Sequence, residues 1–536
     1  MKADAGGPSR RAILKGGMAA ATVLALPACE TPTSGSSGGA DMALGHRLRD
    51  GAFPEPVREE RVPLLIAGGG VAGLSAGWRL REAGFDDFRL IELEDQPGGN
   101  ARGGRNAVSA YPLGAHYLPI PNEEARGLRH MLRQMGVIVG ERDGKPVYDP
   151  LQLCADLQER LLWQGKWQEG LVPRTGLSSK DEADLAAFNR TMADFSRRRD
   201  TEGRPAFAIP IAYSARDADL LALDRMSFAQ WLDQQGWTSS VLRAHVRYAC
   251  RDDYGTEPAD VSAWAGIHYF ASRRGFTADG SGDNELTWPE GNSRLTSLIA
   301  DRLGDRITTG QVAFRARPDE KGAMVDVFDA QQGSSIRYRA DAVILAMPHF
   351  IATRLLGEKP DAAYSYAPWL IANVTVDRAP EGKGSALAWD NVSASSASLG
   401  YVVATHQSDS HTGPTVLTWY MALSDMPPAS ARRLLVDRSD VDWRRLVRDD
   451  LLGMNPDLNG AIRSIDLWKW GHAMVRPTPG FLWDVAPRQR AAILPPFFRA
   501  HSDLSGLSLF EEAHYRGMAA AEAALSSIGH PHETLL

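Results

Sequence analysis

The sequence predicts an α/β protein with two interleaved domains, on the strength of three observations. At 536 residues the chain is too long for a single ordinary core. Between Val62 and Asn100 the pattern reads as strand, glycine-rich turn, helix and second strand. Two long insertions with mixed helix and strand patterns then separate this segment from later blocks of similar character. Each domain is therefore expected to be assembled from segments far apart in the chain.

Composition excludes several functional classes. The chain is 43% hydrophobic and 23% charged, with a net charge of −7, which gives no reason to expect a nucleic-acid partner. The tract Arg197–Arg199 is expected to be a solvated helix face. Three cysteines cannot build a disulfide framework, and no Cys/His cluster has metal-ligand spacing, so we expect no metal site.

The N-terminus has the pattern of an export signal. Arg10 and Arg11 precede an apolar run over about 16–28, which is shorter than the ~20 residues of a spanning helix. The stretch resembles a twin-arginine signal, and "LPAC", ending at Cys29, resembles a lipobox. We expect residues 1–29 to be a signal peptide recognised by the twin-arginine translocase. The protein would then reside in the periplasm or cell envelope, anchored by a lipid on Cys29; cleavage and release is the alternative. Residues 30–57, rich in Ser and Gly, are expected to form a flexible linker.

The first motif with a chemical reading follows the strand over 64–67. Gly68, Gly70 and Gly73 have the G-x-G-x-x-G spacing, which permits a tight turn, close approach to a pyrophosphate and close helix packing. The helix that starts at Val71 and Ala72 offers free N–H groups to phosphates. A second strand over 88–91 ends at Glu92, an acceptor for ribose hydroxyls. This is a Rossmann-type dinucleotide site.

The segment "QPGGNARGGRNAVSAYPLGAHYL" identifies the dinucleotide by resemblance. It resembles the flavin amine oxidase superfamily, which includes protoporphyrinogen oxidases and phytoene desaturases. The resemblance implies FAD as the cofactor. It places two groups of residues beside FAD, which are Gly98, Gly99 and Arg102, and then Gly114, Ala115 and His116. Asn100 stands where the family often has arginine, so the side chain that does the arginine's work is not fixed by the motif.

Three later blocks carry the same resemblance. "TWPEGNSRLTSLIADRLGDRITTGQVAFRAR" implies that the backbone of Val312 faces the adenine, and Ser293 is the expected N-cap of its helix. "YRADAVILAMPHF" resembles the strand at which the chain leaves the nucleotide domain. In "LSGLSLFEEAHYRGMAAAEAAL" we assign Glu512 rather than Glu511 to the family's acid, and Gly517 to a close approach between helix and cofactor.

The blocks imply the domain organisation. An FAD-binding domain would comprise residues 58–120, 285–348 and 502–530, and a mixed α+β substrate domain residues 121–284 and 349–501. Within the first insertion, Ser227 and Gln230 have capping-box spacing. Within the second, strand-like runs suggest a sheet with one face toward a pocket.

Candidate catalytic residues come from this substrate half. His116, Tyr420 and Trp470 are expected in the pocket, and His472 is a further candidate for its wall. Aromatic residues of a sheet are equally expected in the core. Asp252 and Asp253 could anchor a substrate ammonium, but a helix cap or an ion pair with Arg251 is the favoured interpretation. The family's flavin-proximal lysine has no clear counterpart; Lys469 is the nearest.

The combined hypothesis is an exported FAD-dependent oxidoreductase that oxidises an amine, with polyamines as first candidates, by hydride transfer to flavin N5. The small-molecule substrate would be oxidised at the expense of oxygen or a quinone, and the sequence does not choose between them. The alternatives are an FAD-dependent desaturase or porphyrinogen-type oxidase, and a non-catalytic envelope flavoprotein. Folding around FAD in the cytoplasm would explain a signal for export in the folded state.

Overall fold

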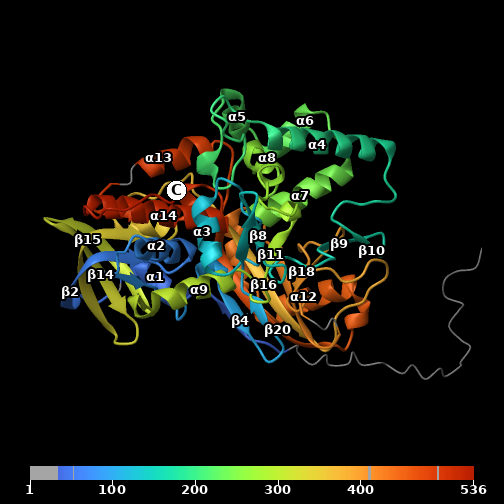
Figure 1. Ribbon diagram of the computed structural model, residues 1–536. Coiled ribbons are helices and arrows are strands. Elements are labelled where there is room, and N and C mark those ends of the chain that lie inside the picture. Colours follow the sequence, from blue (N-terminus) through green and yellow to red (C-terminus); the bar gives the residue numbers. More distant parts are fainter. Residues whose placement is uncertain (1–33, 52, 409–411, 492–493) are drawn as a thin grey trace, which may run out of the picture. The chain divides into compact units, whose positions relative to one another are not determined.

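Two large β-sheets organise the protein (Figure 1). The computed structural model describes residues 34–51, 53–408, 412–491 and 494–536. The predicted signal peptide, with Arg10, Arg11 and Cys29, lies outside these described residues. Among the described helices, none is both long and apolar enough to traverse a bilayer.

The first sheet has seven strands and contains the glycine motif. Its order is β12-β3-β2-β15-β14-β13, with β21 also paired to β15. Strands β12, β3, β2, β15 and β21 run parallel, and β13 and β14 form an antiparallel extension. The bounds are β2 Pro56–Ala67, β3 Phe88–Ile91, β12 Ile307–Thr308, β13 Gln311–Asp319, β14 Gly322–Asp329, β15 Ser334–Leu345 and β21 Phe497–Arg499.

Helices pack on both faces of this sheet because its central strands are apolar on both sides. Leu64 and Ile66 pack in one core with helices α2 (Val71–Glu82), α3 (Arg126–Gln134), α9 (Ser293–Leu303) and α14 (Phe510–Ser527). Leu65 packs in a second core with helix α10 (His349–Leu355). The C-terminal helix α14, red in Figure 1, lies beside α2. The parallel strands and their helices form the predicted Rossmann-like unit.

The second sheet has eight strands in the order β1-β20-β16-β19-β18-β17-β9-β10. Helices α11 (Pro428–Asp437) and α12 (Asp440–Met454) cover one face. The other face carries aromatic side chains, including Trp369, Tyr420 and Trp470. The bounds are β1 Ser37–Gly39, β9 Glu159–Trp163, β10 Lys166–Glu169, β16 Tyr366–Val376, β17 Asp390–Ser393, β18 Tyr401–Val403, β19 Thr415–Ala422 and β20 Ile462–Val475.

A helical layer with its own core accompanies the second sheet. The predicted capping box of Ser227 and Gln230 is present at the start of α6. The helices of the layer are α4 (Ser179–Arg197), α5 (Ala218–Ala222), α6 (Phe228–Gln234), α7 (Ser240–Tyr254), α8 (Ala263–Ala271) and α13 (Ala486–Ala491). Three strand pairs complete the fold, namely β4 (Gly103–Arg105) with β5 (Ala110–Pro112), β6 (Tyr117–Pro119) with β11 (Glu285–Thr287), and β7 (Ile138–Arg142) with β8 (Lys145–Tyr148).

Three local expectations were wrong. The described part of the predicted flexible linker contains β1 and helix α1 (Met42–Asp50), because its glycines let the chain lie directly on β20. The N-cap of α9 is Asn292, and Ser293 is the first helical residue. Strand β21 pairs with β15 although the boundary at residue 502 assigned it to the other domain.

Candidate active site

The turn between β2 and α2 builds one end of a large cavity. Gly68 has φ +107°, and a Cβ there would lie 2.3 Å from the Ala346 carbonyl oxygen, so only glycine fits. A Cβ on Gly73 would lie 1.8 Å from the Gly68 oxygen, which explains the close helix packing. Helix α2 begins after Gly70 without a side-chain cap, so its first N–H groups remain available at the cavity wall.

Glu92 lies where the ribose acid was predicted, at the end of β3. Its carboxylate accepts the Gly69 amide at 2.5 Å and the Glu94 amide at 2.9 Å, and the residue is 8% exposed. Burial raises its pKa, and the two amide hydrogen bonds oppose this shift. Glu92 therefore fixes the glycine turn in addition to lining the cavity.

A second loop closes the other side of this cavity. The Gly98 amide donates to the Gly69 carbonyl at 2.8 Å, while Gly99, Asn100 and Arg102 line the cavity. Arg102 donates to Glu94 at 3.2 Å and to Asp95 at 2.6 Å. Ala115 and Val312 also line it, as predicted. Gly98 itself supports the loop, and Gly114 lines the neighbouring cavity.

The residues present fit a dinucleotide such as FAD. The cavity measures about 360 Å³. A Cβ on Gly70 would meet only the Gly99 Cα, at 3.8 Å, so a larger residue would project into the cradle between the two loops. The Nε–H of Arg102 is buried and has no hydrogen-bond acceptor among the described residues. The free amides and the unsatisfied Arg102 donor suit a pyrophosphate, and the acid at the end of β3 can accept hydrogen bonds from ribose hydroxyls.

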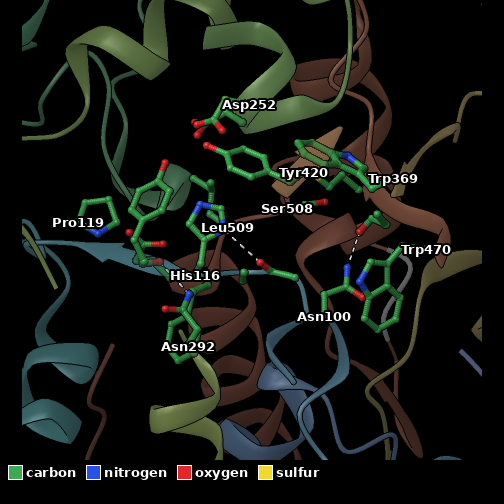
Figure 2. A pocket seen from close by; sticks show the side chains of 18 of the residues that line it. Asn100, His116, Pro119, Asp252, Asn292, Trp369, Tyr420, Trp470, Ser508 and Leu509 are labelled. Carbon is green, nitrogen blue, oxygen red and sulfur yellow. Dashed lines mark hydrogen bonds between the residues drawn. The ribbon is translucent and has the colours of Figure 1, made fainter. Parts of the chain in front are cut away.

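A second cavity, of about 150 Å³, shares part of its wall with the first. Figure 2 shows the side chains that line it. His116, Tyr420 and Trp470, the predicted catalytic residues, all line it. The shared wall of the two cavities consists of Asn100, Ala115, Trp470, Ala473, Ser508, Leu509 and Phe510. A molecule in the second cavity would therefore lie against one end of a ligand in the first.

Hydrogen bonds hold the aromatic wall in place. The Trp470 indole donates to the Leu113 carbonyl at 2.6 Å, and the Tyr420 hydroxyl donates to Asp390 at 3.1 Å. The His116 ring lies 5.0 Å from that of Tyr420, and its Nδ1 lies 3.1 Å from the Gly114 carbonyl oxygen. Burial lowers the pKa of His116 to about 4. A neutral His116 donates through Nδ1 and leaves Nε2 as an acceptor.

Acidic side chains also line this cavity, and Asp252 lies beside Tyr420 (Figure 2). Asp252 and Asp253 lie on α7, and Glu511 lies in the first turn of α14. Burial raises the pKa of Asp252 to about 7, and the adjacent Asp253 adds to the shift. Burial likewise raises the pKa of Glu511 to about 7. Glu511 is 5% exposed. A hydrogen bond from its own backbone amide opposes the rise in its pKa.

Further carboxylates lie behind this lining. Asp390 accepts the hydroxyls of Tyr248 and Tyr420, and burial raises its pKa well above the usual range. Burial also raises the pKa of Glu285 to about 8, with Glu159 as the next cause. Within the described residues these acids form no group that could hold a metal ion.

The favoured interpretation of the acid pair was wrong. Asp253 forms its ion pair with Arg273, whereas Arg251 approaches Glu257 at 3.6 Å. Both aspartates line the cavity.

Four other assignments also need correction. Glu512 is fully buried away from both cavities, where it accepts the Ile211 amide; Glu511 lines the site instead. Gly517 lets α14 approach α2, since a Cβ would lie 2.1 Å from the Ala72 oxygen, and does not line either cavity. His472 packs against the rings of Phe350 and Tyr366. Lys469 donates to Asp440 at 2.7 Å.

Sequence reasoning missed two groups of cavity residues. His501 and Ser502 follow β21, the strand whose end faces the dinucleotide cavity. Their position directly after an apolar strand is the signal that could have identified them. Ala40, Asp41, Gly45 and Leu48, from the predicted linker, also line this cavity. The one signal in the sequence is the spacing of Asp41, Gly45 and Leu48, which places them on one face of a helix.

Comparisons with known proteins agree with this architecture. A family model described as an NAD(P)-binding Rossmann-like domain matches residues 66–135. No curated protein matches the sequence. Putrescine oxidase bound to putrescine is structurally similar, with 16% identity, a TM-score of 0.63, and coverage of 87% of this chain and 100% of that chain.

Two further solved structures show the range of activities found on this fold. Cyclohexylamine oxidase from Brevibacterium oxydans IH-35A has 16% identity and a TM-score of 0.62, covering 87% of this chain and 99% of that chain. A CLA-producing fatty acid isomerase from P. acnes has 14% identity and a TM-score of 0.57, covering 86% and 98%. The chain is thus a mixed α/β protein with a Rossmann-like domain, and its fold matches that of amine-oxidase-like flavoprotein structures.

Proposed function

We propose that this protein is an FAD-dependent oxidoreductase that oxidises an amine. The observation that carries the proposal is the second cavity, which adjoins the dinucleotide cavity and is lined both by aromatic side chains and by the carboxylates of Asp252 and Glu511. Buried carboxylates without an ion-pair partner are costly, and a cationic substrate would compensate them. Structural similarity to putrescine and cyclohexylamine oxidases supports the same class.

FAD, when bound, supplies the acceptor for a hydride from the substrate carbon. The protein's own residues bind, orient and deprotonate the substrate. Trp470 and Tyr420, fixed by their hydrogen bonds, confine the substrate between them and the shared wall. Asp252 and Glu511 receive the ammonium group, and ionised Glu511 can accept a proton to leave the neutral amine that oxidation requires.

Polyamines remain the first candidates within the amine class. Asp252 and Glu511 lie on different helices, α7 and α14, so the cavity presents carboxylates from two directions. A second ammonium group of the substrate could pair with the carboxylate that the reacting nitrogen does not use.

The test is anaerobic mixing of the purified yellow protein with mono-, di- and polyamines, followed by the flavin absorbance. Bleaching by an amine supports the proposal. A flavin that stays oxidised with every amine and is bleached by a porphyrinogen or another carbocyclic substrate would establish the desaturase or porphyrinogen-type class instead. The apolar side chains of Ile209, Met474 and Leu509 in the lining are the feature that favours this second class.

Export through the twin-arginine route is a separate part of the proposal. It depends on the pattern of Arg10, Arg11 and Cys29 in the sequence. Replacing both arginines with lysine should leave folded flavoprotein in the cytoplasm, and Cys29→Ala should abolish labelling by a lipid precursor. Normal export of the double-lysine variant would refute this route.

A further inference from the structure

Residues 34–51, here called the N-terminal strap, lie on the outer side of the dinucleotide cavity. Ala40, Asp41, Gly45 and Leu48 of the strap all line that cavity. The strap precedes β2, so it is an addition to the strand–turn–helix unit that holds the glycine motif. Its position raises the question of what it contributes to the cavity.

The first half of the strap is fixed to the edge of the eight-stranded sheet. Strand β1 pairs in parallel with β20, from Ser37 opposite Leu467 to Gly39 opposite Lys469. The glycines permit this contact: a Cβ on Gly35 would lie 1.9 Å from the Ile465 oxygen, and a Cβ on Gly38 would lie 2.4 Å from the Trp468 ring. The strap thus has glycine at positions where it packs directly against β20.

Arg444 of helix α12 fastens the same half from outside the cavity. Its guanidinium donates to the carbonyls of Gly35 and Ser36 at 2.9 and 3.0 Å and to the Ser37 hydroxyl at 2.8 Å. Arg445, the next residue, pairs instead with Asp442 on its own helix. The two neighbouring arginines therefore differ in their contact with the strap.

The second half of the strap crosses to the cofactor side. Asp41 caps α1 through the Leu44 amide, and its own amide donates to Glu94 at 2.9 Å. Glu94 also accepts from Arg102, which lines the cavity. Leu48 packs on the core of the seven-stranded sheet. Asp41, Gly45 and Leu48 lie at helical spacing, so one face of α1 forms the wall.

We propose that the N-terminal strap is a part of the cofactor site, seated after the dinucleotide has entered and retaining it there. This inference rests on the proposed FAD function. The strap pairs with the edge of one sheet and packs on the core of the other, and its residues line the cavity wall. Release of a bound dinucleotide past this wall therefore requires the strap to detach. Its docking strength then sets the rate of cofactor loss.

The first experiment compares Arg444→Met with its matched control Arg445→Met. The rate of FAD release from purified holoprotein is followed by the rise in flavin fluorescence. Loss of the hydrogen bonds to the strap should make release about tenfold faster in Arg444→Met, while Arg445→Met should match the parent. Equal release from all three proteins would overturn the proposal.

A second pair of variants tests the wall itself. No atom lies within 4 Å of a Cβ built on Gly45 or on the exposed Gly453 of α12, so a side chain can start at both positions without a clash at Cβ. Gly45→Phe should fill the wall and reduce FAD content to below about a tenth of the parent's, whereas Gly453→Phe should retain full content. Full FAD content in Gly45→Phe would refute a role for the strap in the site.

The same variants separate this inference from the proposed function. If the parent protein takes up NAD⁺ rather than FAD, the proposed function fails, and the dissociation constants of the four variants for NAD⁺ then test the strap. If the parent holds FAD and reacts with amines but Arg444→Met loses FAD no faster, only the strap proposal fails. Trypsin provides an independent readout, since cleavage after Arg47 and Arg49 should be faster in the apoprotein than in the holoprotein.

Discussion

Arg273 donates to both carboxylate oxygens of Asp253, at 2.8 and 3.0 Å, and so distinguishes two acids that are adjacent in the sequence. Asp252, the neighbour of Asp253, has no ion pair among the described residues yet lines the same cavity. Asp253 is therefore neutralised within the protein, and Asp252 remains available to a cationic substrate.

This difference predicts opposite phenotypes for two isosteric changes. Asp252→Asn should raise the KM for an amine by about ten- to a hundredfold, because a charged hydrogen bond is worth ~1.5–3 kcal/mol. It should not lower the melting temperature, because the raised pKa of Asp252 means that its ionised form does not stabilise the fold. Asp253→Asn should lower the melting temperature, since it leaves the Arg273 charge without its partner. Steady-state kinetics and thermal unfolding measure the two effects. Equal KM values for Asp252→Asn and the parent would contradict the role of Asp252.

Glu511→Gln should change the pH dependence of substrate binding. Burial raises the pKa of Glu511 and of Asp252 to about 7, so both ionise as the pH rises through neutrality. The positive charge of Arg273 lowers the pKa of Glu511, while the negative charges of Glu512 and Asp253 raise it. An alkylammonium with a pKa of about 10 stays charged over this range, so its apparent affinity should rise from pH 6 to pH 8.

The apparent dissociation constant from stopped-flow flavin reduction measures this effect. In Glu511→Gln the affinity should rise less steeply with pH, because one of the two ionisations is removed. A slope identical to the parent's would exclude Glu511 from substrate binding.

His116→Gln should leave the pH dependence of the rate of flavin reduction unaltered between pH 6 and 9. Burial lowers the pKa of His116 to about 4, so the imidazole is already neutral throughout this range. Glutamine preserves a donor and an acceptor near Tyr420, and the flavin should remain bound. The rate of flavin reduction as a function of pH is the measurement. Disappearance of an ionisation near neutrality in this variant would show that His116 titrates there after all.

Glu92→Ala should weaken FAD binding by about one to two decades, the value of a charged hydrogen bond. The carboxylate also accepts the amides of Gly69 and Glu94, so its removal loosens the glycine turn as well. Glu92→Gln, which keeps one acceptor oxygen, should lose less affinity. Titration of the apoproteins with FAD compares the three; identical affinities would remove Glu92 from the cofactor site.

Glu285→Gln should flatten the pH dependence of stability. Burial raises the pKa of Glu285 from an ordinary value of 4.5 to about 8 in the folded protein. The folded state therefore holds this proton more tightly than the unfolded state, and stability falls as the pH rises from about 4.5 to 8. The slope per group is at most ~1.4 kcal/mol per pH unit. Melting temperatures between pH 5 and 9 should fall less steeply for the variant than for the parent.

Local patterns predicted the Rossmann-like unit well because its chemistry is local. The strand over 88–91 and the helix after Gly70 lie where the sequence placed them, and Glu92 contacts the glycine turn. The glycine turn, the helix and the acid lie within 25 residues of one another, so their spacing in the sequence is enough to predict how they are arranged.

Contacts between distant segments could not be predicted in this way. The glycines of the strap indicate flexibility when considered alone, and only Ile465 and Trp468 reveal that they permit close packing. The choice between Glu511 and Glu512 depends on a helix rotation of about 100°, which the packing of α14 decides. His472 turns away from the cavity that Trp470 lines because the pairing of β16 with β20 shifts register between these positions.

The arrangement of the seven-stranded sheet also constrains the synthesis of the protein. Its first strand starts at Pro56, whereas β21 ends at Arg499 and the covering helix α14 ends at Ser527. A nascent chain therefore cannot complete this core until residues as far as Ser527 have left the ribosome, and such long-range pairing folds slowly. Chains that terminate early would lack both the strand and the helix. Completion of the sheet thus depends on segments that are synthesised more than 400 residues after its first strand.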